Sequence, residues 1–114
     1  MRLTRDRAEL VAEAARKLQI IATGNTLEAE YAEQIDEKLD PLLMQLSVDN
    51  ICNIGDTDQI PSEIFDSLAR LLANISADDF GAQFDPGIKQ IQEAYIKRTM
   101  SSRGNRSVQE AEYF

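Results

Sequence analysis

The strongest constraint on the fold is the spacing of apolar residues in the segment IPSEIFDSLARLLANISADDFG, from Ile60 to Gly81. Apolar side chains recur there every three or four residues, which places them on one face of an α-helix. They are Ile64, Leu68, Leu71, Leu72 and Ile75, with Phe65 on the flank. Pro61 and Glu63 suit the first helical turn, and Phe80 and Gly81 close the helix. The segment predicts a well-bounded helix with one buried face.

Two amphipathic segments precede it. The first begins at Leu3, with Thr4 as N-cap, and stops at Gly24 and Asn25. The second is capped by Thr26 and continues to Leu46, with Pro41 inside its apolar pattern. Proline interrupts helical hydrogen bonding, so we expect a bend at Pro41 with Asp40 as the new cap.

A fourth helix begins at Asp85–Gly87, and its apolar residues are expected to face inward: Ile88, Ile91, Ala94 and Tyr95. Residues 48–59 lack a helical period, and they predict a strand-like stretch followed by a turn. The chain is therefore predicted to be all-α, a compact bundle of four main helices with an extended C-terminal tail. Residues 1–100 form the helical domain. Residues 101–114 form a flexible C-terminal arm that we expect to order on a partner.

Composition excludes several functions. The 114 residues include no histidine, which removes histidine metal sites, Ser-His-Asp triads and the commonest general acid–base group. The single cysteine, Cys52, excludes an intrachain disulfide and reads as a half-buried small hydrophobe. No run reaches the roughly 18–20 apolar residues of a membrane span. The charged N-terminal segment does not match a signal peptide, so we expect an intracellular chain.

The acidic residues between 49 and 58 do not match a calcium loop. Asp49, Asn53, Asp56 and Asp58 are oxygen donors, but Gly55 precedes two of the acids and no glutamate ends the loop. No metal ion, cofactor or catalytic residue is therefore predicted.

Charge is distributed unevenly around the formal net charge of −8. Residues 25–96 hold fifteen acidic and three basic residues, whereas residues 97–106 hold four basic residues and no acid. An acidic body disfavours ordinary nucleic-acid binding. It is either a solvated surface or a wall that does not adhere to DNA. The basic run is likewise either part of a solvated surface or a docking element for an acidic partner surface.

Two stretches resemble the head-to-tail adaptor (connector, tail accessory factor) family of tailed bacteriophages. Residues 15–46, ARKLQIIATGNTLEAEYAEQIDEKLDPLLMQL, pair a helix end and glycine turn with a leucine-rich capped helix. Residues 60–81 start at Ile-Pro and end near Phe-Gly, and a fourth helix and basic tail follow. Pro41 departs from the family pattern and puts the straightness of the second helix in doubt.

The resemblance implies a virion protein of the neck between capsid and tail, present in the host cytoplasm during assembly. Such adaptors form a homo-oligomeric ring, generally a dodecamer, beneath the portal protein. The ring extends the DNA channel, through which DNA passes without specific binding, and offers a platform to a tail or nozzle protein. It needs no membrane. The resemblance also implies a C-terminal portal-binding arm: Lys97, Arg98, Arg103, Arg106, Tyr113 and Phe114.

Ring closure needs complementary patches on each subunit. Candidate inter-subunit residues pair N-terminal arginines with acids of the second helix: Arg5 and Arg7 with Glu33, Asp36 and Glu37. Candidates for a channel-facing or tail-facing loop are Asp49, Asp56 and Asp58. On this hypothesis, reversing the charges of Arg5 and Arg7 weakens assembly.

Two other functions remain open at this point. A small acidic helical regulatory or inhibitory protein that mimics DNA would share the charge but would need no basic, aromatic-ended tail. Loss of portal binding on deleting residues 99–114 would favour the adaptor over it. A carboxylate-only glycan hydrolase would need two carboxyl groups across a cleft, and Asp78 and Asp79 instead suit a helix end. The chain is expected not to be an enzyme.

Overall fold

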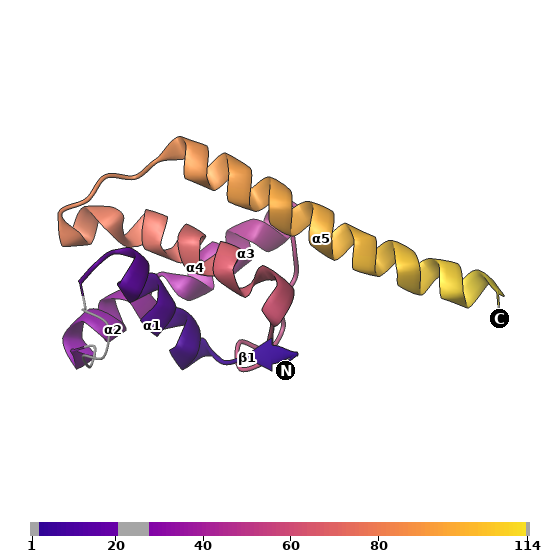
Figure 1. Ribbon diagram of the computed structural model, residues 1–114, viewed down its shortest axis with the longest axis horizontal. Helices are drawn as coiled ribbons and strands as arrows, with labels where there is room; N and C mark the ends of the chain where they lie inside the picture. The colour runs from indigo at the N-terminus through magenta and orange to yellow at the C-terminus, as the bar shows by residue number, and fades with distance from the viewer. Residues whose placement is uncertain (1–2, 21–27, 114) are drawn as a thin grey trace.

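The computed structural model describes residues 3–20 and 28–113, with side chains as far as residue 101. Figure 1 shows helices packed into one bundle from which the last helix projects. The elements, in chain order, are β1 (Thr4–Arg5), α1 (Arg7–Lys17), α2 (Ala29–Asp36), α3 (Leu39–Val48), β2 (Ile60–Pro61), α4 (Ser62–Ser76), the 3-10 helix η1 (Ala77–Phe80) and α5 (Pro86–Tyr113). The predicted all-α bundle is confirmed. The structure also contains a short antiparallel β-ribbon that was not predicted, in which Thr4 of β1 pairs with Pro61 of β2.

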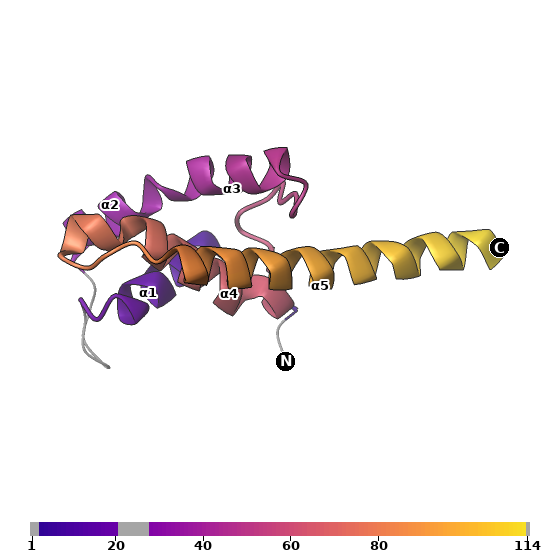
Figure 2. The same cartoon turned by 90° about the horizontal axis from the view of Figure 1, so that it is seen from above.

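Helix α4 occupies the centre of the bundle. It contacts α1, α2, α5 and both strands. Its predicted apolar face is buried at Ile64, Leu68, Leu71 and Leu72, whereas Ile75, predicted on the same face, is only partly buried. Phe65 is buried as well rather than lying on the flank. Burial on more than one side follows because α1 and α5 cover different faces of α4 (Figure 2).

Helix α1 begins two residues later than predicted. Asp6, not Thr4, is the N-cap: its carboxylate accepts a hydrogen bond from Glu9 N at 2.8 Å, and Glu9 Oε1 accepts one from Asp6 N at 3.3 Å. This reciprocal capping box satisfies two amides of the first turn. Thr4 instead lies in β1. The predicted turn at Gly24 and Asn25 and the cap at Thr26 lie outside the described residues.

The second predicted helix is two helices, α2 and α3. The break falls at Glu37 and Lys38, three residues before Pro41. Pro41 then occupies the first turn of α3, where a missing amide hydrogen removes no helical bond. The bend is therefore present, but Asp40 is not the cap, because Lys38 occupies that position.

Residues 49–59 form turns, not the strand-like stretch predicted there. Asn50 adopts φ 59° just after α3, and Ile51 and Cys52 then turn into the core. The alternating pattern therefore reflects two buried anchors in a connecting loop, and the short strand β2 follows it. Burial raises the pKa of the Cys52 thiol, in line with its predicted role as a small apolar side chain.

Helix α5 turns a different face inward from the one predicted. Ile96 is fully buried and Met100 packs against the core. The residues predicted to face inward are all exposed: Ile88, Ile91, Ala94 and Tyr95. The backbone remains helical through Tyr113, and its last turns project beyond the bundle (Figures 1 and 2). Ordering of residues 101–114 on a partner stays a prediction. Within the described residues, no helix is both long enough and apolar enough to cross a membrane.

We expect Leu68→Ala to lower the free energy of unfolding by about 2–5 kcal/mol, because it leaves a cavity at the centre of α4. The matched control, Met44→Ala on the exposed side of α3, should change it by no more than about 0.5 kcal/mol. Urea titration followed by circular dichroism measures both. Similar losses in the two variants would contradict this description of the core.

Candidate functional site

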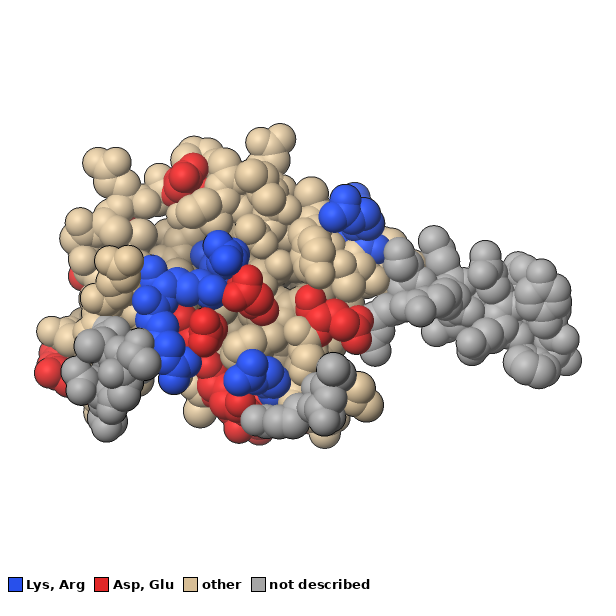
Figure 3. Space-filling model, in the orientation of Figure 1, with Lys and Arg blue, Asp and Glu red and all other residues tan. Residues whose placement is uncertain are grey.

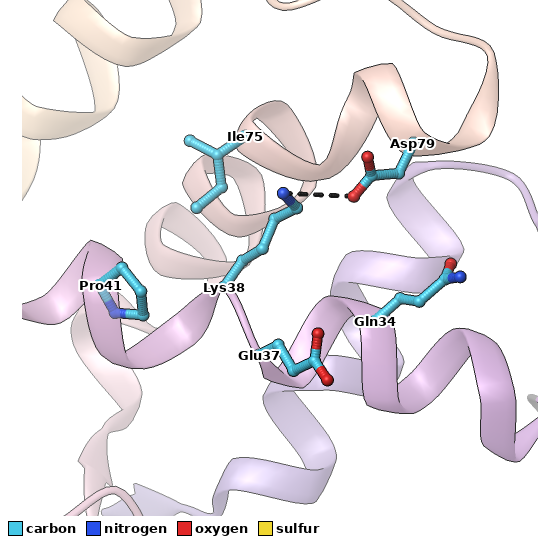
Figure 4. A pocket seen from close by; sticks show the side chains of 6 residues that line it. All are labelled: Gln34, Glu37, Lys38, Pro41, Ile75 and Asp79. Carbon is cyan, nitrogen blue, oxygen red and sulfur yellow. Dashed lines mark ion pairs between the residues drawn. The ribbon is translucent and has the colours of Figure 1, made fainter.

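Among residues 3–20 and 28–101, no group of three or more Cys, Asp or Glu side chains could hold a metal ion. A hollow with a volume of about 590 Å³ lies between the α2–α3 break and the end of α4 (Figure 4). It is lined by Gln34, Glu37, Lys38, Pro41, Ile75 and Asp79.

Lys38 spans this hollow and its ammonium group lies 3.2 Å from Asp79 Oδ2. Figure 4 shows the Glu37 carboxylate apart from that pair. A general acid of the glycosidase type needs a carboxyl group kept protonated by an apolar site, and Glu37, Asp78 and Asp79 are all exposed. The hollow therefore offers no support for a carboxylate hydrolase.

Arg7 joins α1 to the break between α2 and α3. Its guanidinium donates to the Asp36 carboxylate, to the Asp36 carbonyl at 3.1 Å and to Asp40 Oδ1 at 2.9 Å. These charge-assisted bonds raise the pKa of Arg7 and hold the pKa of Asp40 below its ordinary value. Arg7 and Asp36, both candidates for contacts between subunits, are thus paired within one chain.

The other candidates for contacts between subunits differ in accessibility. Arg5 pairs with Glu9 at 3.1 Å and places its guanidinium carbon 4.3 Å from the centre of the Phe65 ring. Glu33 and Glu37 are exposed on α2 and its C-cap. These two glutamates are therefore the better placed to meet a neighbouring surface.

The three loop aspartates are exposed in the connection between α3 and β2. Asp49 accepts a hydrogen bond from Gln45 Nε2 at 3.0 Å, and Asp56 Oδ1 accepts one from the Asp58 amide at 2.9 Å. The second contact is a local turn motif that stiffens the loop. The loop presents acidic groups at the surface without gathering them around one point.

The predicted arm begins on α5, where Lys97 and Arg98 are exposed. The Arg98 guanidinium carbon lies 5.8 Å from the centre of the Tyr95 ring, within cation–π range. The side chains of Arg103, Arg106 and Tyr113 lie outside the described residues, as does Phe114.

An apolar stripe beside this arm was missed as a surface. It comprises Phe84, two residues before α5, and three side chains of the helix itself: Ile88, Ile91 and Tyr95. In Figure 3 the surface over α5 is largely uncharged between an acidic group near its start and basic groups where the described side chains end. The signal was present as a 4-3-4 spacing, but periodicity does not distinguish an exposed apolar line from a buried one.

No family model matches this sequence, and neither a curated protein nor a solved structure does.

Acid should weaken the ion pairs that join α1 to the other helices. Asp66 accepts from Lys17 at 2.7 Å and from Arg70 at 2.8 Å, and these bonds lower its pKa, as those of Arg7 lower that of Asp40. A depressed pKa stabilises the fold at pH values above the ordinary 3.8, and this stability is lost as the pH falls through the folded-state value. The urea midpoint should therefore fall between about pH 5 and about pH 3.

The acid-induced fall of the urea midpoint should be smaller in Asp40→Asn and in Asp66→Asn. Each variant removes one carboxyl group whose pKa differs between the folded and unfolded states. Urea titrations at a series of pH values measure it. A fall equal to that of the wild type in both variants would show that these pairs do not contribute.

Proposed function

We propose that this chain is a structural head-to-tail adaptor of a tailed phage, which assembles as a ring under the portal protein and extends the DNA channel. The observation that carries the proposal is the continuation of α5 beyond the bundle (Figure 1). Met100 is the last described side chain that packs against the core. From there, the helix backbone of residues 102–113 projects away from the bundle and continues the basic run of residues 97–106, so that it is suited to binding a partner ring.

The charge distribution supports the same function. A channel wall must not bind DNA, and the bundle that precedes the arm is strongly acidic. The basic run of residues 97–106, where the arm begins, carries the opposite sign, so the acidic body and this run would bind different partners. The acidic loop with Asp49, Asp56 and Asp58 is then a candidate surface for the tail or nozzle protein.

Ring formation would use a heterologous contact, in which two different patches of each subunit meet. Glu33 and Glu37 are proposed as the acidic side of that contact. Charge reversal of Arg7 no longer tests the ring cleanly, because Arg7 holds α1 to α2 and α3 within the chain. The role would be one of assembly, with no turnover and no cofactor.

The first test is a chain that lacks residues 102–114. Unlike deletion from residue 99, this truncation retains Met100 and so preserves the core. We expect it to fold as the wild type does and to lose portal binding by about tenfold or more, as measured by sedimentation with purified portal rings. A full-length Arg103→Ser/Arg106→Ser variant separates the charge of the arm from its length.

Undiminished portal binding by the truncated chain would contradict the proposed arm. An acidic inhibitory protein that mimics DNA would retain its activity without residues 102–114, so the same truncation distinguishes the two functions.

The second test concerns the ring. Glu33→Lys/Glu37→Lys should weaken ring assembly on the portal without changing the urea midpoint, because both side chains are exposed. The control, Asp56→Lys/Asp58→Lys, changes the charge by the same amount in the loop and should leave the ring intact. Electron microscopy of portal complexes gives the ring occupancy. Rings of normal occupancy in the first variant would exclude these glutamates from the contact.

A further inference from the structure

The apolar stripe of α5 is unusual for the surface of a small monomer. Phe84, Ile88, Ile91 and Tyr95 are 40%, 38%, 65% and 39% exposed, although each is a large hydrophobic side chain. Contiguous apolar surface of this kind marks an interaction site. The stripe lies beside the face of α5 that meets the bundle, where Ile96 is buried and Glu93 and Lys89 form an ion pair at 2.9 Å.

The order of side chains in the stripe points to its occupant. It reads aromatic, isoleucine, isoleucine, aromatic, at intervals of four, three and four residues. The same order results when the segment from Phe84 to Tyr95 is read backwards. A contact between two identical copies related by a two-fold axis requires such self-complementarity, because each residue then faces its counterpart from the other end.

We propose that this stripe pairs with the same stripe of a second copy of the chain, with the two α5 helices antiparallel. Phe84 then faces Tyr95 of the second copy, and Ile88 faces Ile91. Intervals of three and four residues are those at which side chains interdigitate between two packed helices.

The residues beside the stripe permit this approach. Gly87 and Ala94 lie seven residues apart along one of its edges. In the antiparallel register that pairs Phe84 with Tyr95 and Ile88 with Ile91, Ala94 of one copy lies two residues beyond the point opposite Gly87 of the other. Both small residues therefore flank the contact, and the helix backbones can come close. Bulky residues at either position would hold the helices apart.

Charge selects the antiparallel direction over the parallel one. Asp85 precedes the helix, held by its amide hydrogen bond to Asn74 Oδ1 at 2.8 Å, and Arg98 lies one turn beyond Tyr95. An antiparallel pair brings Asp85 of each copy towards Arg98 of the other, whereas a parallel pair brings like charges together. Figure 3 shows these opposite signs at the two ends of the described part of α5.

A contact made by four side chains per copy belongs to the small class of interfaces, below about 1,200 Å². We therefore expect a reversible dimer of the free chain. A two-fold contact is satisfied by two copies and does not propagate. The dimer would thus cover the stripe before assembly without itself building a ring, and it does not depend on the proposed adaptor function.

Sedimentation equilibrium of the full chain tests the pairing. The wild type should dimerise with a Kd below about 1 mM. Ile91→Asp should be monomeric at every protein concentration up to about 1 mM, because the variant places two charges, one from each copy, at the centre of the contact. The control is Met44→Asp, which changes an equally exposed apolar residue on α3 (Met44 is 70% exposed) and should dimerise as the wild type does. Circular dichroism verifies that both variants fold.

Direction is tested by oxidative cross-linking of two single-cysteine-addition variants, Ile88→Cys and Ile91→Cys. A mixture should yield the 88–91 disulfide faster than either variant yields a disulfide with itself. Cys52 is buried and its thiol pKa is raised, so it competes poorly. Faster 88–88 cross-linking would overturn the antiparallel register.

A monomeric wild type would overturn the proposal, and so would a dimer that Met44→Asp dissociates and Ile91→Asp does not. If the wild type is monomeric and Ile91→Asp instead weakens portal binding, the stripe belongs to the portal contact. The truncation of residues 102–114 leaves the stripe intact, so it should remove portal binding and preserve the dimer. Failure of the adaptor function and failure of the dimer are thus distinguishable.

Discussion

Burial of α4 on several sides is the constraint on which the other elements depend. Leu68, Leu71 and Leu72 are almost completely removed from water, and removal of such side chains from water is the main favourable term in folding. Because α4 is covered on different faces by α1, α2 and α5, each of these helices has its position set by contact with the same central element. The small residues Ala14 and Ala15 let α1 approach it closely.

Polar contacts fix the start of α1 and the segment that leads from the core into α5. The capping box of Asp6 and Glu9 starts α1, and Arg7, the next residue, fastens it to the α2–α3 break. At the other end, the Asn74 side chain is buried and exchanges two hydrogen bonds with the backbone of Asp85, at 2.9 and 2.8 Å. This pair holds the chain immediately before α5, and so it sets the rotation at which that helix meets α4.

The sequence was most informative where periodicity and burial coincide. In α4 the predicted apolar face is the buried face, and Pro61 is its N-cap. The α-helix ends at Ser76, and Gly81 caps the 3-10 helix η1 that follows it. A break near Pro41 was correctly predicted, but its position was not, because Lys38 rather than Asp40 is the N-cap of the new helix. Alternation in residues 48–59 suggested a strand, yet Ile51 and Cys52 are isolated anchors of a loop, and two such residues do not distinguish the cases.

The face of α5 could not be predicted from its own residues. Two apolar lines compete: Ile88, Ile91 and Tyr95 on one side, Ile96 and Met100 on another. The first line is the richer, but the anchor at Asn74, which lies in a different helix, decides in favour of the second. For the candidate site, the exposure of the charged residues Lys97, Arg98, Glu33 and Glu37 could be expected from the sequence. The pairing of Arg7 with Asp36 depends on the tertiary approach of two helices and has no local signature.

The small number of buried side chains on α5 has a consequence for the dynamics of this helix. Within the described residues, this helix contributes a single fully buried side chain, Ile96, whereas α4 contributes many. Local opening is least costly where little apolar surface is exposed by it. We therefore expect amide hydrogens of α5 to exchange with solvent through sub-global openings that leave α1 and α4 folded. The helix could then release one partner and engage another without the chain unfolding.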